Sequence, residues 1–292
     1  MHFPMHFPML FLQDPSLTFR ASADSVGLDV SVRRGGRPVT GLTAADFIVV
    51  DNGVPQVVTD VSYEKLPIDV TVALDVSASV TGPILDQLRM AVRQLEGDLG
   101  PQDRLKLIGF NMRIALLADF GPAAPHRPAL DGLQGSGSSS IFDTVAVALA
   151  TPVPADRRQV IVLFTDGQDS SSVTSAATLL DVARRTTPTV HVVLAALPEF
   201  QTLGKPPLTP RDAAVQQVFG RLATDTGGSL ISISGNVSLT SMFRRPLDEF
   251  RASYVLHFIP RGVAPRGTHT LSVRINRPGT FDIRARSGYV WR

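Results

Sequence analysis

The stretch IDVTVAL, residues 68–74, is a run of mostly apolar and β-branched residues, and Asp75 follows it directly. QVIVLFT, residues 159–165, has the same character and is followed by Asp166. Such runs are typical of strands that are buried on both faces of a sheet. Between them, apolar residues recur at spacings of three and four, which predicts a helix. They are Ile84, Leu85, Leu88, Val92, Leu95 and Leu99.

Strand-like and helix-like segments alternate through the rest of this region. Further strands are predicted over Arg104–Phe110, Arg113–Leu117, Val190–Leu197 and Ser229–Ser234. Further helices are predicted over Ile141–Leu149, Ser175–Arg185, Asp212–Thr224 and Leu239–Arg251. This alternation predicts an α/β fold, with a doubly wound, mostly parallel sheet and helices on both of its faces. Ligands of such sheets bind at the carboxyl ends of the strands.

Both flanks of this region show strand periodicity only. Strands are predicted over Val26–Val32, Phe47–Val50, Gln56–Val61, Tyr254–Ile259, Thr270–Ile275 and Phe281–Arg286. Because three strands alone are marginally stable, we expect the two flanks to form one small β-sandwich into which the α/β domain is inserted. The expected division is a tail over 1–17, sandwich strands over 18–65, the α/β domain over 66–252 and the completing strands over 253–292.

The chain begins with MHFPMHFPMLFL, residues 1–12. This segment lacks the basic start and the cleavage site of a complete signal peptide, and it is too short to span a bilayer. It is either the remnant of an export signal whose start is missing or a disordered tail. We expect an extracytoplasmic protein, secreted or held in the periplasm or cell envelope. No later segment has the ~20 apolar residues of a transmembrane helix.

Composition and missing motifs exclude several function classes. The formal net charge of +2 provides no broad field for nucleic acid, and the absence of cysteine excludes thiolate catalysis and Cys-type zinc sites. No Gly-x-x-x-x-Gly-Lys or Gly-x-Ser-x-Gly motif is present. Phosphatases with an Asp after a buried strand need a second acid two residues on, where this chain has Ser77. We therefore expect no enzyme.

Three polar clusters border the predicted strands and helices: Asp75-x-Ser77-x-Ser79, the loop GSGSSS over 135–140, and Thr165-Asp166-Gly167. Residues i, i+2 and i+4 of an extended loop face one way, so the first cluster can address a single ion. Carboxylate and hydroxyl oxygens suit Mg²⁺, and then Mn²⁺ or Ca²⁺. With only two carboxylates, the ion would keep an exchangeable position for an incoming carboxylate. The alternative role for these side chains is helix N-capping.

These clusters resemble the metal-ion-dependent adhesion site (MIDAS) of von Willebrand factor A domains, and the wider chain resembles a bacterial VWFA-related group common in Acidobacteria. Supporting stretches are GRPVTGL over 36–42, DNG over 51–53, TGG over 226–228 and ARSGY over 285–289. The resemblance implies the metal ligands Asp75, Ser77, Ser79, Ser139 and Asp166. Ser139 stands where the family has threonine, which leaves the choice among Ser138, Ser139 and Ser140 open.

The resemblance also implies a function, that of a metal-dependent protein-binding or cell-adhesion module. Its cofactor would be Mg²⁺, or Mn²⁺ or Ca²⁺, and its partner a protein that presents a carboxylate. An intracellular assembly or regulatory subunit that works with an ATPase is the alternative. A metal-dependent hydrolase is the least favoured hypothesis.

Overall fold

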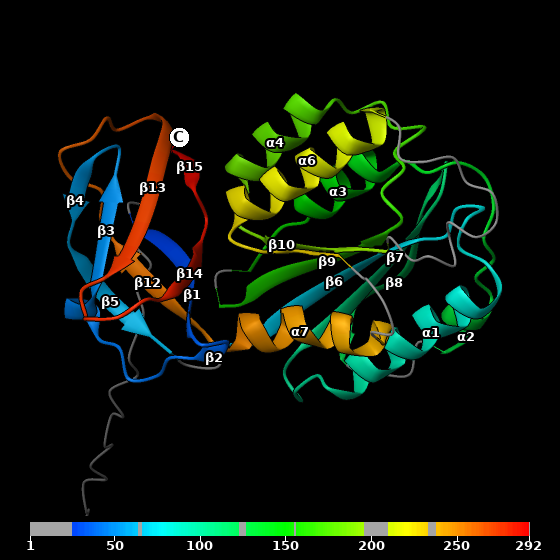
Figure 1. The fold of residues 1–292 in the computed structure, drawn as a ribbon, viewed down its shortest axis with the longest axis horizontal. Coiled ribbons are helices and arrows are strands. Elements are labelled where there is room, and N and C mark those ends of the chain that lie inside the picture. The colour runs from blue at the N-terminus through cyan, green and yellow to red at the C-terminus, as the bar shows by residue number, and fades with distance from the viewer. Residues whose placement is uncertain are drawn as a thin grey trace, which may run out of the picture.

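The computed structural model describes residues 25–63, 66–122, 127–154, 156–195, 210–232 and 238–291. Two bodies lie side by side (Figure 1). The smaller body is built of strands, and the larger has a central sheet with helices on both faces. The tail expected over 1–17 and most of the loop after the strand predicted over Val190–Leu197 lie outside the described residues.

The large sheet has six strands in the order β11-β10-β9-β6-β7-β8. They are β6 (Ile68–Asp75), β7 (Arg104–Phe110), β8 (Ile114–Pro122), β9 (Arg158–Thr165), β10 (Thr189–Leu194) and β11 (Leu230–Ser232). All neighbouring pairs are parallel except β7 and β8, which makes the sheet mixed. The predicted mostly parallel, doubly wound arrangement is therefore present.

Helices cover both faces of this sheet (Figure 1). One face carries α3 (Ile141–Leu149), α4 (Ala176–Arg185) and α6 (Pro210–Thr226); the other carries α1 (Gly82–Gly97), α2 (Arg127–Asp131) and α7 (Leu239–Arg251). Side chains of β6 alternate between the two cores: Val72 and Leu74 pack with α1 and α7, and Ala73 packs with α3 and α4. Burial on both sides explains why β6 reads as a continuous apolar run. Within the described chain, no helix is long and apolar enough to cross a membrane.

The smaller body has two sheets that share one apolar core. One sheet contains β1 (Val26–Arg34), β2 (Arg37–Pro38), β5 (Val58–Ser62), β12 (Ser253–Phe258) and β14 (Asp282–Ala285). The other contains β3 (Phe47–Asp51), which follows the short helix η1 (Ala44–Asp46), β4 (Val54–Gln56), β13 (Gly267–Ile275) and β15 (Gly288–Trp291). Strands from the two flanks pair directly, β1 with β12 and β3 with β13.

Three details of the structure differ from the prediction. The single strand predicted over Gln56–Val61 is wrong, because β4 and β5 belong to different sheets and the chain crosses between them at Val57, which is 75% exposed. The strand β15 was not predicted. The helix α2 of the larger body was not predicted either, and its Leu130 is buried in the core beside α1.

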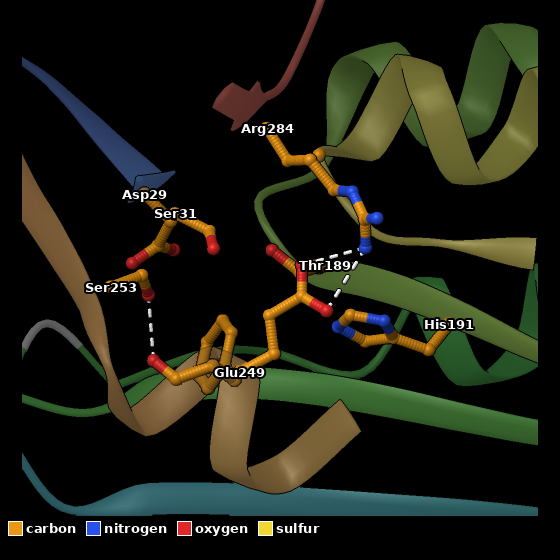
Figure 2. A pocket seen from close by; sticks show the side chains of 9 residues that line it. Asp29, Ser31, Thr189, His191, Glu249, Ser253 and Arg284 are labelled. Carbon is orange, nitrogen blue, oxygen red and sulfur yellow. Dashed lines mark hydrogen bonds and ion pairs between the residues drawn. The ribbon is translucent and has the colours of Figure 1, made fainter. Parts of the chain in front are cut away.

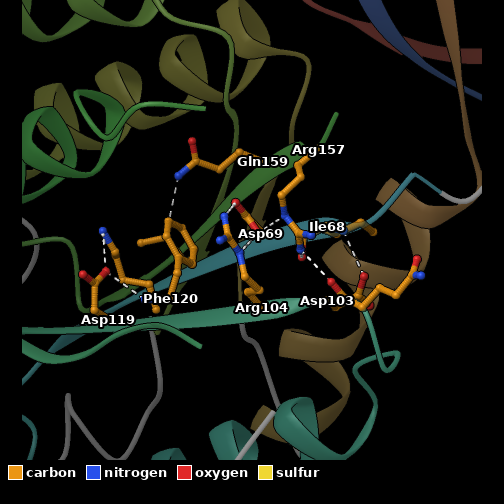
Figure 3. Close-up of polar contacts among 11 residues, drawn as sticks. Ile68, Asp69, Asp103, Arg104, Asp119, Phe120, Arg157 and Gln159 are labelled. Atoms are coloured by element: carbon orange, nitrogen blue, oxygen red, sulfur yellow. Dashed lines mark hydrogen bonds and ion pairs between the residues drawn. The ribbon is translucent and has the colours of Figure 1, made fainter. Parts of the chain in front are cut away.

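At the amino edge of the large sheet, buried carboxylates are neutralised by arginines (Figure 3). Asp69, at the start of β6, accepts hydrogen bonds at 2.5 Å from both Arg104 and Arg157. Asp103 accepts from the backbone N–H of Ile68 at 2.9 Å and pairs with Arg251 at 2.5 Å. These contacts join the starts of β6, β7 and β9 to the end of α7.

The two bodies meet at a polar junction (Figure 2). Only Ala252 separates α7 from β12. Arg158 of β9 is buried and donates to Asp29 at 2.7 Å and to Ser253 at 2.6 Å. Glu249 of α7 pairs with Arg284 of β14 at 2.8 Å. The cavity at this junction, about 10 Å³, has room for at most a single water molecule.

His191 of β10 lines this junction and makes stability sensitive to acid. Its Nδ1 lies 2.9 Å from the Ser229 hydroxyl, and Nε2 is buried without a partner among the described residues. Burial lowers the pKa of His191 from 6.5 to about 3, and the positive charges of Arg284 and Arg245 add to this effect. Below pH 6.5 the unfolded chain therefore binds a proton that the folded protein does not bind. The free energy of unfolding falls as the pH is lowered from about 6.5 to about 3.

We predict that His191→Asn removes this acid sensitivity, because asparagine keeps a partner for Ser229 without titrating. Urea unfolding at a series of pH values should show wild type losing up to about 1.4 kcal/mol more per pH unit than the variant across that window. Carboxylates titrate in both proteins and cancel in the difference. Parallel stability curves for the two proteins would contradict the assignment.

Candidate metal centre

Asp75 lies at the carboxyl end of β6, where three structural elements meet. Its carboxylate is inaccessible to solvent. Oδ1 accepts a hydrogen bond from the backbone N–H of Ser77 at 3.0 Å. Oδ2 accepts from the Thr165 hydroxyl at 2.7 Å and from the Ser139 hydroxyl at 3.0 Å. The carboxylate thus links the ends of β6 and β9 with the loop before α3.

Asp166 joins the same cluster from the neighbouring strand end. Its Oδ2 accepts a hydrogen bond from the Ser79 hydroxyl at 2.6 Å, and the hydroxyls of Ser77 and Ser79 lie 3.1 Å apart. Because β6 and β9 are adjacent parallel strands, their carboxyl ends deliver Asp75 and Asp166 to one edge. The structure therefore brings all five of the predicted site residues together.

The loop before α3 presents only one of its three candidate serines to Asp75. The Ser138 hydroxyl donates to Ser171 at 3.1 Å, and the Ser140 hydroxyl donates to the carbonyl of Asn111 at 2.6 Å. Ser139, which is 2% exposed, is the serine that reaches the Asp75 carboxylate. The geometry thus favours Ser139 among the alternatives that the sequence left open.

Backbone packing holds this loop close to the loop after β6. The N–H of Ala78 donates to the carbonyl of Gly137 at 3.0 Å, and the N–H of Ser136 donates to the carbonyl of Val76 at 2.9 Å. At Gly135 a Cβ atom would lie only 2.1 Å from the carbonyl oxygen of Val80. Glycine at position 135 is therefore required for the close approach of the two loops.

Two residues near the site, Thr165 and Asp143, are not among the predicted metal ligands. Thr165 was predicted as the last residue of a strand, yet its buried hydroxyl contacts Asp75 directly. Asp143, in the first turn of α3, accepts hydrogen bonds from the backbone N–H groups of Val173 and Thr174 at 2.9 and 2.7 Å. Burial raises the pKa of Asp143, but these hydrogen bonds outweigh it and leave the pKa below its usual value. Asp143 therefore fixes the loop after β9.

The electrostatics of the cluster suit a cation. Burial raises the pKa of Asp75 above its usual value, the nearby carboxylate of Asp166 raises it further, and hydrogen bonds from Ser77 and Thr165 oppose the rise. At the amino edge of the sheet, arginines neutralise Asp69. The described partners of Asp75 are uncharged donors, so the charge of a divalent ion would offset its burial.

The donor set also limits the kind of ion. Among the described residues, no three His, Cys, Asp or Glu side chains gather at one place, so a site made of such ligands alone is not found there. The cluster instead offers two carboxylates and the hydroxyls of serine and threonine, which are hard oxygen donors. Such donors fit Mg²⁺, Mn²⁺ or Ca²⁺, and Asp75, Ser77, Ser79, Ser139 and Asp166 are the side chains that would hold the ion.

The fold and the cluster of oxygen donors place this protein in a class of doubly wound α/β domains. Domains of this class have a polar site at the carboxyl ends of the strands. Residues 70–168 match the family model described as von Willebrand factor type A domain. The chain therefore carries a von Willebrand factor type A domain, as the sequence resemblance predicted.

The chain is similar to several solved structures. A von Willebrand factor type A protein from Catenulispora acidiphila aligns with a TM-score of 0.50 at 11% identity, over 92% of this chain and 75% of that one. An aerotolerance-related membrane protein from Bacteroides fragilis aligns with a TM-score of 0.47 at 16% identity, over 63% and 98%. Proximal thread matrix protein 1 from the mussel byssus, described with a zinc-occupied MIDAS motif, aligns with a TM-score of 0.48 at 14% identity, over 65% and 46%.

Proposed function

We propose that this chain is a metal-dependent protein-binding module of the adhesion type. The observation that carries the proposal is the convergence of Asp75 and Asp166 with three serine hydroxyls at one edge of the sheet. The ion would be Mg²⁺, Mn²⁺ or Ca²⁺, and the partner would present a carboxylate.

The side chains of the site would divide the work of binding. Ser77, Ser79 and Ser139 provide neutral hydroxyl oxygens, and Asp75 and Asp166 provide the negative charge. A divalent ion bound there would supply an electrophilic position, because two carboxylates only balance its charge. Thr165 positions Asp75 by donating to the same oxygen as Ser139. This role is binding and not catalysis, in line with the absence of nucleophile motifs from the sequence.

We further propose that the smaller body is a β-sandwich that carries the binding domain, with the divisions 18–65, 66–252 and 253–292. Support comes from the core that its two sheets share and from the direct pairing of β1 with β12. The single residue between α7 and β12 and the Glu249–Arg284 pair would keep the two bodies in a fixed orientation.

A matched pair of serine variants tests the metal site. We predict that Ser139→Ala weakens Mn²⁺ binding by at least about tenfold, because one direct donor is lost, whereas Ser138→Ala binds as wild type does. Isothermal titration calorimetry on the full chain measures both. Absence of Mn²⁺ and Mg²⁺ uptake by wild type would refute the proposal, and equal losses in the two variants would refute the assignment of Ser139.

A further inference from the structure

The strand β8 forms one edge of the large sheet, beside the metal centre. It pairs with β7 on one side and is the last of the described strands in the sheet order. The pairing with β7 is regular from Ile114 to Leu116, and the irregularities fall beyond Leu116, toward the far end of the strand. Bulges and charged side chains are common means of protecting an edge from pairing with other chains. The irregular half of β8 also carries Asp119, whereas the regular half has neither kind of protection.

The regular half of this edge exposes apolar side chains. Ile114 is 37% exposed and Leu116 is 59% exposed, and Met112, in the turn that precedes them, is 62% exposed. Ile114 lies opposite Phe110 and Leu116 lies opposite Ile108, so each pair points to the same face of the sheet. Phe110 and Ile108 are buried in the core beside α3, and their partners on β8 extend that apolar surface into solvent.

This exposed edge is continuous with the metal centre. The turn before β8 contacts the loop that holds Ser139: the backbone N–H and the hydroxyl of Ser140 both donate to the carbonyl of Asn111. Met112 lies 3.4 Å from the position of a Cβ atom on Gly137 in the same loop. Arg113 is exposed and directly precedes Ile114, the first residue of β8. It adds a positive charge at the start of the β8 edge.

The spacing of strands in a sheet gives the distance between the β8 edge and the metal centre. β8 lies two strands away from β6, so a strand added outside β8 would lie three spacings, roughly 14 Å, from the strand that ends at Asp75. An extended chain covers about 3.3 Å per residue, so about four residues bridge that distance. A single extended segment can therefore reach both the metal and the edge.

We propose that the β8 edge from Ile114 to Leu116 pairs with an extended segment of a partner protein, in which an Asp or Glu lies about four residues from an apolar, β-branched stretch. The inference rests on the proposed function, because the acidic residue is the one that binds the metal. Backbone hydrogen bonds to β8 supply affinity, and the apolar side chains on the shared face supply selectivity. The positive charge of Arg113 favours the acidic end of the segment.

Selection from a displayed library of random dodecapeptides tests this inference. The immobilised full chain is exposed to the library in Mg²⁺, and parallel selections use Leu116→Lys, Asp75→Asn and the control Val57→Lys. Val57 is an exposed apolar residue in the smaller body, so its variant controls for a general loss of apolar surface. Ile114→Lys serves as an independent second variant of the edge.

The inference expects Mg²⁺-dependent peptides with an acid about four residues from a β-branched stretch. These peptides should bind Leu116→Lys and Ile114→Lys at least about tenfold more weakly than they bind wild type. They should bind the control Val57→Lys with the same affinity as wild type. Mg²⁺-dependent peptides that bind both edge variants normally would overturn the inference and leave the metal function intact. Peptides lost with Leu116→Lys but indifferent to Mg²⁺ and to Asp75→Asn would overturn the inference, because the edge would then bind without the metal; the calorimetric titration with Mn²⁺ decides separately whether the metal site exists. A selection without any peptide sensitive to Leu116→Lys overturns the inference.

Discussion

Asp75→Asn is expected to weaken divalent-cation binding strongly while leaving the metal-free protein at least as stable as wild type. The carboxylate is inaccessible to solvent, and its described hydrogen bonds come from uncharged donors. Burial and the Asp166 charge both disfavour its ionised form. Asparagine removes the charge and the repulsion; its oxygen can accept from the Ser77 N–H, and the hydroxyls of Thr165 and Ser139 can rotate to accept from its amide group. At a binding residue, the buried charge lowers the stability of the protein without the ion, so its removal does not destabilise the metal-free protein. Replacement of a purely structural residue would destabilise it.

The same substitution should weaken cation binding by roughly 100-fold or more, since it removes one of two negative charges from the ion's surroundings. Calorimetry with Mn²⁺ measures the loss. Thermal melts provide a second measurement, because a ligand at 100 times its dissociation constant stabilises the folded state by about 2.7 kcal/mol. Wild type should therefore melt at a higher temperature in Mg²⁺, and the variant should not.

Asp86→Asn is the control, because Asp86 is an exposed carboxylate on α1 that contacts Arg89. It should retain the effect of Mg²⁺ on melting. If Asp75→Asn destabilised the metal-free protein by several kcal/mol, Asp75 would be a structural residue. If the variant still took up Mn²⁺ with wild-type affinity, the metal centre would lie elsewhere.

The main outline of the site was predictable from sequence because its signals are local. The continuous apolar runs of β6 and β9 identify strands buried on both faces, and each run is followed by polar residues at its carboxyl end. The helices α3 (Ile141–Leu149) and α7 (Leu239–Arg251) have the predicted bounds. In each, the helical spacing of apolar residues extends over the same residues as the helix. Adjacency of parallel strands then brings Asp75 and Asp166 together without further information.

Features decided by distant partners were not predictable in this way. Ser138, Ser139 and Ser140 are chemically identical, and only their packing against Ser171, Asp75 and Asn111 distinguishes them. The hydroxyl of Thr165 acquires its role from Asp75, which is 90 residues away in sequence. Likewise, β4 and β5 read as one strand because a crossing between sheets leaves no local mark beyond the exposure of Val57.

The core of the smaller body contains a polar cluster of this long-range kind. Asp51 of β3 is inaccessible to solvent, and its two oxygens lie 2.8 and 3.1 Å from Nδ1 of His269 in β13. The Tyr289 hydroxyl of β15 donates to Asp51 at 2.7 Å, and its ring stacks on His269 with centroids 4.7 Å apart. Burial raises the pKa of Tyr289, and the hydrogen bond to Asp51 adds to the rise, so the tyrosine remains a donor. One carboxylate thus ties the three strands together.

Asp51→Ala should destabilise the smaller body by about 3–5 kcal/mol, because the substitution leaves His269 and Tyr289 buried without their shared acceptor. This is a large part of the ~5–15 kcal/mol by which a domain is usually stable. Trp291, the sole tryptophan, lies in β15 with its ring 5.8 Å from His269, so its fluorescence reports unfolding of this body in urea.

Two control variants accompany this measurement. Asp51→Asn keeps an acceptor for the tyrosine and should lose less stability than Asp51→Ala, and the exposed Asp60→Ala should lose almost none. Mn²⁺ uptake by folded Asp51→Ala should equal that of wild type, because Asp51 belongs to the other body. An unchanged urea midpoint would show that the cluster is not what holds β3, β13 and β15 together.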